Sequence, residues 1–288
     1  MSEHFDGGNQ KTAAKLVILE ECLDIYTTIM DANWSGENWY VDTHAGTGRT
    51  RINDEGIHLD GSAIIAIEEY SDSFDRFYFY ELDEDHFETL IETLSDEFGL
   101  DFDVGPVDVD GENFQVARAE DPYIRIMQMD SNEGVSFLAE NAAERHHWFT
   151  FIDPKGLTAK RDTLDTLIDR GNMDILLNYQ TTGVMRSAAA EHAHGAVTRT
   201  MGDEDWPNAA TSDEYVEVYK TKLEENQSIA PVKSKELVSP HDRRNRFDLV
   251  FACTNDQVRE IVEDIMQQEE LWSKANDKFG QSGLGDWC

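Results

Sequence analysis

The stretch Trp39-Tyr-Val-Asp-Thr-His-Ala-Gly-Thr-Gly48 joins a short apolar run to a loop that contains two glycines. Trp39 to Val41 has the composition of a buried strand, and this run enters the loop at Asp42. Glycine lets the backbone turn tightly and approach a ligand closely. In an open parallel sheet, ligands bind beyond the carboxyl ends of the strands, so the loop lies where a ligand site is expected.

Apolar runs further along the chain alternate with helical patterns. The helical pattern over 11–30 has apolar residues spaced by three and four, and later helices end at Gly99 and Gly171. The remaining strands are predicted at 77–80, 123–129, 148–152, 174–177, up to about 238, and 247–252. We therefore expect an α/β fold in a single domain over 1–288, with a mostly parallel seven-stranded sheet and helices on both faces. This strand count indicates a Rossmann-like methyltransferase fold.

Two segments depart from this alternation. Residues 101–121 break into short acidic pieces with Gly105-Pro106 and Asp110-Gly111 turns, which predicts an inserted hairpin. Residues 187–230 are polar and rich in small residues, without a clear period. We expect this second segment to be a lid or a substrate-facing insertion.

The charge of the chain is strongly negative. Its 288 residues include 59 acidic and 24 basic side chains, for a formal net charge of −35, and the acidic excess is spread along the whole sequence. At about 1 M salt the Debye length falls to about 3 Å, which would screen the self-repulsion of such a chain. The composition therefore indicates a halophilic protein from a salt-filled cytoplasm, whereas an acidic protein made to hold a basic partner would show clustered charge.

The sequence favours a soluble, cytoplasmic protein without a structural metal. No apolar run approaches the about 20 residues of a membrane span, and the segment 1–10 is polar, without a signal-peptide core. Cys22, Cys253 and Cys288 are too far apart to indicate a metal cluster, and their odd number argues against a disulfide framework. The histidine pairs at 146–147 and 192–194 lack the further ligands that a metal site needs.

Acidic residues follow the next three predicted strands as well. Glu81 ends the second strand, where a carboxylate is suited to accept both hydroxyls of a ribose. Asp130, Ser131 and Asn132 end the third strand and are suited to receive an adenine amino group, and Asp153 ends the fourth. Each acid on its own is also typical of a solvated loop, but four acids at four successive strand ends favour an adenosyl ligand.

These segments resemble the three-Cys-motif partner (TcmP) family, over about residues 11–270. The resemblance rests on Trp39 to Gly48, Gly61-Ser-Ala-Ile-Ile-Ala66, Tyr78-Phe-Tyr-Glu-Leu-Asp83, Phe151-Ile-Asp-Pro-Lys-Gly156 and Arg243 to Ala252. It implies a branch of the S-adenosylmethionine-dependent methyltransferases and, as a partner, a three-Cys-motif protein. The site it implies is made by Asp42, His44, Gly46, Gly48, Glu81 and Asp130, and the neighbouring Thr43, Ala45 and Ser131 complete our cofactor-binding candidates.

The loop after the first strand also argues against a dinucleotide. Residues 49–60 separate the glycines from the next helix, for which Ser62 is the expected N-cap. A helix N-terminus aimed at a pyrophosphate is therefore not implied, which counts against NAD and FAD.

The expected catalytic residues are Asp153 and Pro154. Amino-methyltransferases that act on adenine commonly place Asp or Asn, two prolines and an aromatic ring after the fourth strand, so that the acid or amide receives the amine hydrogens and the ring stacks on the base. Here Lys155 and Gly156 follow, so the acceptor is present and the stacking ring is absent. Tyr179 and Trp148 are alternative rings.

Two functions remain open from the sequence. Lys155, Arg243 and Arg244 are the expected substrate-binding residues, because basic loops at the open edge of the sheet can hold the phosphates of a nucleic acid. The first function is methyl transfer to an amino group of a nucleic-acid base. The second is a catalytically silent partner subunit that keeps the scaffold for protein–protein contact, which the missing ring after Pro154 favours.

Overall fold

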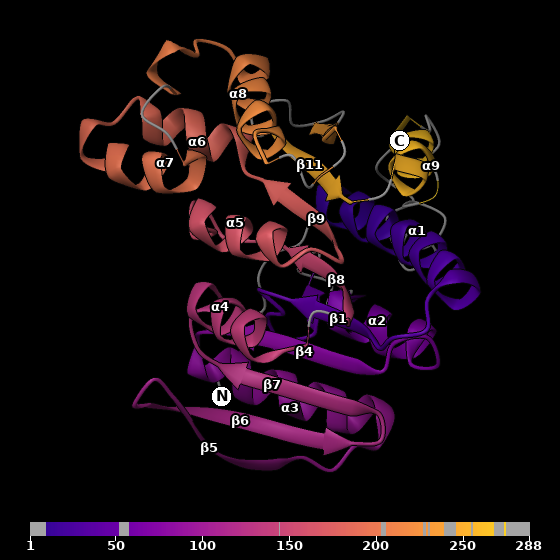
Figure 1. Cartoon of the computed structure of the whole chain (residues 1–288). Coiled ribbons are helices and arrows are strands. Elements are labelled where there is room, and N and C mark those ends of the chain that lie inside the picture. Colours follow the sequence, from indigo (N-terminus) through magenta and orange to yellow (C-terminus); the bar gives the residue numbers. More distant parts are fainter. Residues whose placement is uncertain are drawn as a thin grey trace.

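A nine-stranded sheet runs through the centre of the molecule (Figure 1). The computed structural model describes residues 10–51, 58–143, 145–202, 206–226, 229, 231–238, 246–254, 256–267 and 274. Arg243 and Arg244 lie outside these residues. The strands of this sheet are β1 (Asn38–Asp42), β4 (Arg76–Glu81), β5 (Asp103–Val109), β6 (Glu112–Glu120), β7 (Tyr123–Gln128), β8 (His147–Ile152), β9 (Met173–Tyr179), β10 (Lys233–Val238) and β11 (Arg246–Cys253).

The order of the strands is β10-β11-β9-β8-β1-β4-β7-β6-β5. The five central strands β9, β8, β1, β4 and β7 are parallel, and β11 runs antiparallel to both β9 and β10. Without β5 and β6, seven strands remain, which is the number that the sequence predicts. The carboxyl ends of the parallel strands meet at one edge of the sheet, which is where the candidate site lies.

The predicted number of seven strands is wrong, because the hairpin over 101–121 joins the sheet. β5 and β6 pair with each other, and β6 pairs with β7 antiparallel from Gln115 opposite Gln128 to Glu120 opposite Tyr123. This pairing buries Val116, Ala117 and Ala119 on β6. The sheet therefore has nine strands and is mixed.

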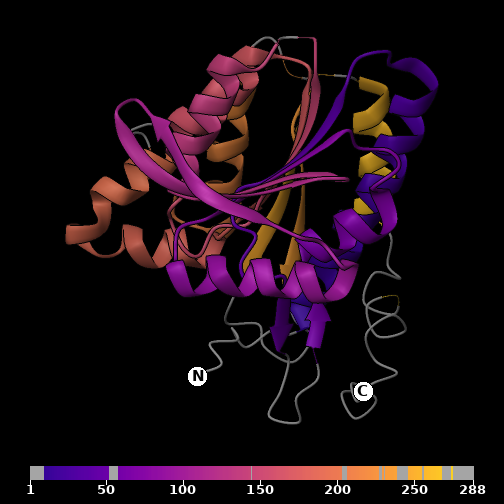
Figure 2. The same cartoon turned by 90° about the horizontal axis from the view of Figure 1, so that it is seen from below.

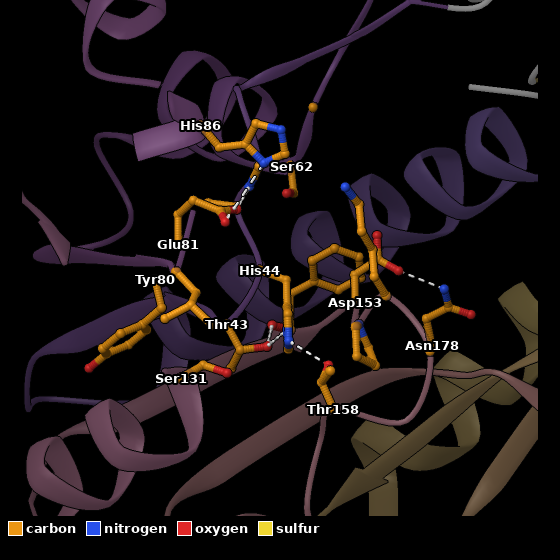
Figure 3. A pocket seen from close by; sticks show the side chains of 18 of the residues that line it. Thr43, His44, Ser62, Tyr80, Glu81, His86, Ser131, Asp153, Thr158 and Asn178 are labelled. Atoms are coloured by element: carbon orange, nitrogen blue, oxygen red, sulfur yellow. Dashed lines mark hydrogen bonds and ion pairs between the residues drawn. The ribbon is translucent and has the colours of Figure 1, made fainter. Parts of the chain in front are cut away.

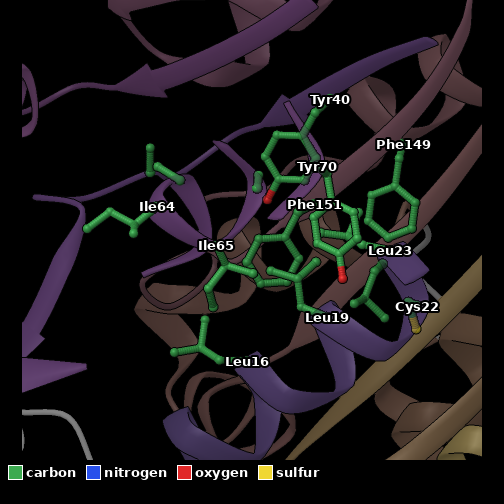
Figure 4. Close-up of a cluster of buried hydrophobic side chains, with 14 of the residues drawn as sticks. Leu16, Leu19, Cys22, Leu23, Tyr40, Ile64, Ile65, Tyr70, Phe149 and Phe151 are labelled. Atoms are coloured by element: carbon green, nitrogen blue, oxygen red, sulfur yellow. The ribbon is translucent and has the colours of Figure 1, made fainter. Parts of the chain in front are cut away.

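Helices cover both faces of the sheet (Figure 2). One face is covered by α1 (Gln10–Asn33), α2 (Ser62–Tyr70), α3 (Glu84–Phe98) and α9 (Asp256–Gln267). The other is covered by α4 (Ser131–Asn141), α5 (Arg161–Arg170), α6 (Thr181–Ala188), α7 (His194–Met201) and α8 (Ser212–Glu224). Alternate residues of β1 serve the two faces: Tyr40 packs with Leu19 and Phe149 under α1 and α2 (Figure 4), while Trp39 and Val41 face the other layer.

The segment 187–230 is mostly helical. It contains α7, α8 and the short 3-10 helices Glu191–Ala193 and Trp206–Asn208. Thr211 starts α8 with a capping box to Glu214, and Tyr219 is buried against Tyr179 of β9, with ring centroids 4.5 Å apart. Of the described residues in this segment, none lines the pocket at the strand ends.

The remaining structure near the site is a small hairpin of β2 (Arg49–Arg51) and β3 (His58–Asp60), which occupies part of the interval between the glycine loop and α2. Among the described residues, no helix combines the length and the apolar composition that crossing a membrane requires.

Candidate active site

A pocket of about 1250 Å³ opens at the carboxyl ends of the parallel strands (Figure 3). Its walls come from the loop after β1, the ends of β4, β7, β8 and β9, and the first turns of α1 and α6. The predicted residues that line it are Thr43, His44, Ala45, Gly46, Gly48, Glu81, Asp130, Ser131, Asp153, Pro154 and Lys155. Sequence positions more than 100 residues apart are therefore brought together as the strand-end argument predicts.

The glycine loop is fastened to the end of β4. The amide of Ala45 donates to the carbonyl of Tyr80 at 3.1 Å, and the amide of Gly46 donates to Glu81 Oε2 at 3.0 Å. Gly46 and Gly48 have φ values of +62° and +78°, in the left-handed region that favours glycine. The loop thus presents its backbone to the pocket beside the Glu81 carboxylate.

Asp42 lies beneath the loop and does not line the pocket. It has no exposed surface, and its carboxylate accepts hydrogen bonds from Ser62 Oγ at 2.5 Å and from the amide of His44 at 3.0 Å. Burial raises the pKa of Asp42 to about 7, against the opposing hydrogen bonds. Asp42 therefore positions the loop and α2. Ser62 is the first residue of α2, and Gly61 takes the N-cap position expected for Ser62.

His44 projects into the pocket as a neutral side chain. Its Nδ1 lies 2.7 Å from Thr43 Oγ1, and its Nε2 lies 3.3 Å from Thr158 Oγ1. Burial lowers the pKa of His44 to about 4, although Asp153 and Asp130 act in the opposite direction. At neutral pH, this ring therefore offers hydrogen bonds and no charge.

Glu81 ends β4 with its carboxylate held in place. Oε2 accepts from Gly46, and Oε1 accepts from the amide of Asp83 at 3.0 Å; His86 Nδ1 lies 3.8 Å from Oε1. The side chain is 13% exposed and lines the pocket. Because a carboxylate oxygen can accept more than one hydrogen bond, Glu81 retains acceptor capacity toward a ligand.

The residues after β7 have different roles: some offer groups to the pocket, and the side chain of another stabilises the fold. Asp130 caps α4 by accepting from the amide of Asn132 at 2.8 Å, and Ser131 follows on the pocket wall. Asn132 Oδ1 accepts from the Lys160 amide at 2.9 Å and from Thr163 Oγ1 at 2.8 Å, so its side chain braces the loop before α5. Asp130 and Ser131 thus remain the better placed groups for a ligand.

Asp153 is held by two residues that the sequence argument missed. Lys15 of α1 forms an ion pair with Oδ2, and Asn178 Nδ2 donates to Oδ1 at 2.6 Å. Burial by itself favours the protonated carboxyl, but the charge and hydrogen bond of Lys15 outweigh it, so the pKa of Asp153 lies below its usual range. The signal in the sequence was weak: Lys15 lies next to Leu16 and Ala14 at the start of an apolar stripe.

The rings offered as replacements for the absent stacking residue are not in the pocket. Trp148 and Tyr179 are 0% and 2% exposed, and both pack in the core. The aromatic rings that do line the pocket include Phe247, at the start of β11, and Phe151. Phe247 is half-buried, and its sequence predicts a strand residue without indicating that its ring lines the pocket.

Pro154 and Lys155 both line the pocket, but they differ in their contacts and exposure. The carbonyl of Pro154 accepts from Gln180 Nε2 at 3.4 Å, which ties the strand end to the turn before α6. Lys155 is exposed on the rim of the pocket. In the described part of the chain, no group of three or more His, Cys, Asp or Glu side chains is arranged to hold a metal ion.

Comparison with known proteins identifies the fold. No family model and no curated protein matches the sequence. A solved structure from Legionella pneumophila, the protein LPL1258 of family DUF519, is similar over 90% of this chain and 92% of its own, with 12% identity and a TM-score of 0.52. Trm1 from Pyrococcus horikoshii, solved with S-adenosyl-L-methionine, has 14% identity and a TM-score of 0.45, over 88% of this chain and 57% of its own. The likeness to LPL1258 shows a shared α/β fold.

Proposed function

We propose that the protein binds S-adenosylmethionine and transfers its methyl group. The observation that carries this proposal is the continuous wall formed by the glycine loop, Glu81, Asp130 and Ser131 along neighbouring strand ends. Glu81 would accept the ribose hydroxyls, and Asp130 and Ser131 would meet the adenine. The backbone at Gly46 and Gly48 would leave room for the methionine end.

The pocket has room for a second ligand. Its volume of about 1250 Å³ lies above the range of about 300–1000 Å³ that is usual for one small-molecule site. In the sheet, β8 and β9 lie on one side of β1 and β4 lies on the other. Asp153 and Asn178 accordingly face the pocket opposite Glu81, with His44 between them (Figure 3). The methyl acceptor would occupy the Asp153 side.

The acceptor we propose is an amino group of a nucleic-acid base. Asp153 is kept ionised by Lys15, so it can accept a hydrogen bond from an amine and orient the nitrogen toward the sulfonium methyl. Phe247 lines the same pocket and offers a ring for contact with a base. The TcmP resemblance adds a three-Cys-motif protein as the proposed partner.

One arrangement favours the alternative of a silent partner subunit. Both oxygens of Asp153 already have partners inside the protein, Lys15 and Asn178, and no aromatic residue follows Pro154. An ion pair of this kind would also hold α1 against the strand ends in a protein without catalysis.

Calorimetry followed by a methyl-transfer assay separates the two functions. S-adenosylmethionine is titrated into the full chain in about 2 M KCl, because the expected screening keeps so acidic a chain folded. Micromolar binding, with transfer of labelled methyl to RNA or DNA that Asp153→Asn reduces at least about 100-fold, supports the proposal. A folded sample that binds no cofactor would contradict it, and binding without transfer to either nucleic acid would favour the silent subunit.

A further inference from the structure

Three Phe, Tyr and Trp side chains among the described residues line the pocket, namely Tyr80, Phe151 and Phe247. Tyr80 and Phe151 are 0% and 1% exposed, and the Tyr80 hydroxyl donates to the carbonyl of Gly134. Phe247 is only half-buried, so part of its surface is open to the pocket. A planar ligand can therefore meet Phe247 but neither of the other two rings.

The exposure of Phe247 reflects its place near the end of a strand. On β11, Leu249 and Phe251 lie on the same face as Phe247, and they are 0% and 1% exposed in the cluster under α1 and α2. Leu237, which is opposite Phe247 on β10, is 1% exposed. Burial thus decreases only where β11 reaches the pocket. Phe247 packs against the core on one side and faces the pocket on the other.

The neighbours of Phe247 in the chain fix its position. Arg246 and Asp248 lie on the opposite face of β11, where the buried Asp248 accepts two hydrogen bonds of 2.9 Å from the Arg246 guanidinium and one from Thr181 Oγ1. The amide of Arg246 donates to Thr182 Oγ1 at 2.7 Å. These contacts join the start of β11 to the start of α6, so the backbone that carries the ring is in place before a ligand binds.

Gln180 lies next to Phe247 and adds a hydrogen-bonding group. Asp248 pairs with Tyr179, so the next positions of the two strands are Phe247 and Gln180. Gln180 lines the pocket, and its Nε2 donates to the carbonyl of Pro154 at 3.4 Å. Its Oε1 has no hydrogen-bond partner among the described residues. This oxygen is therefore an acceptor that can serve a ligand.

The polar groups on this side of the pocket suit a ligand that donates hydrogen bonds. Asp153, the carbonyl of Pro154 and Gln180 Oε1 are all acceptors. Lys15 and Asn178 bring donors, but both already donate to Asp153, and Gln180 Nε2 already donates to Pro154. An amino group on a planar ring could donate here while the ring contacts an aromatic side chain.

We infer that Phe247 and Gln180 form the subsite that recognises the ring of the methyl acceptor, an unpaired nucleobase with an exocyclic amine. Phe247 contacts the face of the base, and Gln180 Oε1 accepts a hydrogen bond at the edge that carries the amine. The base must be unpaired, because pairing would cover both its face and this edge. That the base is a methyl acceptor rests on the proposed function, whereas the roles of the two residues do not need methyl transfer. Stacking serves any base, so Gln180 supplies the preference for an amine.

Four neutral nucleosides test this inference in two matched pairs. Adenosine differs from purine riboside, and cytidine from 2-pyrimidinone riboside, only by the exocyclic amine. Each is titrated by calorimetry into the full chain saturated with S-adenosylhomocysteine, so that the cofactor half of the pocket is filled. We expect the nucleoside with the amine to bind about fivefold more tightly than its partner in at least one pair. Equal affinities within both pairs, or no binding of any nucleoside, would contradict the inference.

Variants of Phe247 test the contact with the face of the base. Phe247→Leu should weaken the binding of every nucleoside that the wild type binds by about tenfold, and Phe247→Tyr, which keeps a ring, should retain the affinity. Phe114→Leu is the control, at a half-buried position of β6 outside the pocket. In protein labelled at its phenylalanine rings, NMR contacts with the base protons should be present and should disappear in Phe247→Tyr, whether or not the leucine variant folds. Unchanged affinity in a folded Phe247→Leu protein, or the absence of these contacts, would exclude Phe247.

Variants of Gln180 test the preference for the amine. Gln180→Met removes the carboxamide and should abolish the preference, whereas Gln180→Glu keeps an acceptor oxygen and should retain it. Both variants lose the donor to Pro154, so a role confined to that contact predicts the same loss in both. Gln115→Met, at an exposed position of β6 outside the pocket, should preserve the preference. A preference that survives in Gln180→Met, or that is lost equally in Gln180→Glu, would exclude Gln180 Oε1 as the acceptor.

The result also separates this inference from the proposed function. If S-adenosylhomocysteine does not bind, the proposed cofactor site fails, and the titrations are repeated on the free protein. The cytidine pair then decides, because adenosine could enter the empty half beside Glu81. Binding that depends on Phe247 and Gln180 would support the subsite in a protein that binds bases without methylating them. Binding that depends on neither residue would contradict it.

Discussion

Glu81 is the residue on which the proposed cofactor site depends most directly. Its two oxygens accept backbone hydrogen bonds from Gly46 and Asp83, so the carboxylate is already oriented when a ligand arrives. Glu81→Gln replaces one acceptor oxygen by an NH₂ group, which can only donate. This group would face either a backbone amide or a ribose hydroxyl, and it could accept a hydrogen bond from neither. We expect the affinity for S-adenosylmethionine to fall about 10- to 100-fold in calorimetry.

Glu92→Gln is the control for this change, because Glu92 is exposed on α3 and does not line the pocket. It should bind the cofactor as the wild type does. An unchanged affinity in Glu81→Gln would remove Glu81 from the cofactor site.

Lys15 has a measurable effect on Asp153. In Lys15→Met, burial still favours the protonated carboxyl while the opposing charge is lost, so the pKa of Asp153 should rise. Any activity that requires the ionised Asp153 should then fall on acidification at a higher pH than in the wild type, so the acidic limb of the pH profile moves to higher pH. The pH profile of methyl transfer measures this shift.

Lys15→Arg keeps the charge and should return the profile toward that of the wild type. Lower activity with the same acidic limb in Lys15→Met would mean that Lys15 only holds α1 in place.

Asp174 of β9 gives the fold a pH dependence of its own. It is 2% exposed, its Oδ1 has no hydrogen-bond partner among the described residues, and burial raises its pKa to about 7. Because the folded pKa lies above the unfolded one, its contribution to stability is complete below about pH 4 and is lost as the pH rises to about 7. Asp174→Asn should remove this loss, of up to about 1.4 kcal/mol per pH unit.

The measurement is the free energy of unfolding by denaturant at several pH values. Asp174→Asn should match the wild type near pH 4 and exceed it near pH 8, while Asp96→Asn, at an exposed position on α3, should follow the wild-type curve. Asp42, whose pKa burial also raises to about 7, leaves part of the slope in the variant. Parallel curves for the wild type and Asp174→Asn would contradict the assignment.

At the scale of elements, α4 reaches its place on the sheet because residue 134 is glycine. A Cβ at Gly134 would lie 2.2 Å from Tyr80 Cε1 and 2.6 Å from Cδ1, and the buried Tyr80 hydroxyl donates to the Gly134 carbonyl at 3.0 Å. Gly134→Ala should therefore destabilise the protein by about 1–3 kcal/mol, although alanine is the better helix former. Because α4 begins at Ser131, its displacement should also weaken cofactor binding.

Gly195→Ala is the matched control, since a Cβ there on α7 would meet its nearest neighbour at 3.5 Å. We expect it to be neutral or stabilising by up to about 1 kcal/mol. Thermal unfolding and calorimetry of both variants give the comparison. A Gly134→Ala protein as stable as the wild type would show that α4 can move away from Tyr80 without cost.

The strands of the core could be predicted because their apolar runs are short and bounded by clear signals. Phe77 to Tyr80 lies within β4, Trp148 to Ile152 lies within β8, and Gly99 ends α3 in a left-handed conformation. The joining of β5 and β6 to the sheet could not be predicted, because their exposed acidic residues follow an edge-strand pattern that does not say which strand they pair with.

The site could be predicted at the strand ends, and less well away from them. The order of parallel strands places Glu81, Asp130 and Asp153 at one edge whatever their side chains do. Lys15 pairs with a residue 138 positions away, and nothing local to α1 indicates that contact. Asp42 shows the opposite error: it does lie at the end of β1, as its last residue, but its side chain turns inward to Ser62.

At the scale of the whole molecule, the net charge of −35 should make the stability of the fold depend on the salt concentration. We expect salt to act in two opposite directions. Screening weakens attraction in ion pairs such as that between Arg246 and Asp213, but exposed pairs of this kind contribute only about 0–1 kcal/mol each. Acidic residues outnumber basic ones by 59 to 24, so repulsion among the exposed carboxylates involves many more groups, and its screening should prevail.

The melting midpoint should therefore rise with KCl, by at least about 4 °C between 0.1 and 2 M, as about 1–2 kcal/mol would produce in a chain of this size. Screening predicts that most of the rise comes below about 1 M, where the Debye length shrinks from about 10 Å to about 3 Å. A rise that continues evenly to higher concentrations would instead indicate a preference for hydrated salt at the carboxylate surface. Sucrose at equal osmolality is the control, because it raises the midpoint through exclusion from the surface without screening any charge. A midpoint that stays constant or falls with KCl would mean that the ion pairs prevail, and the proposed adaptation to a salt-rich interior would then be wrong.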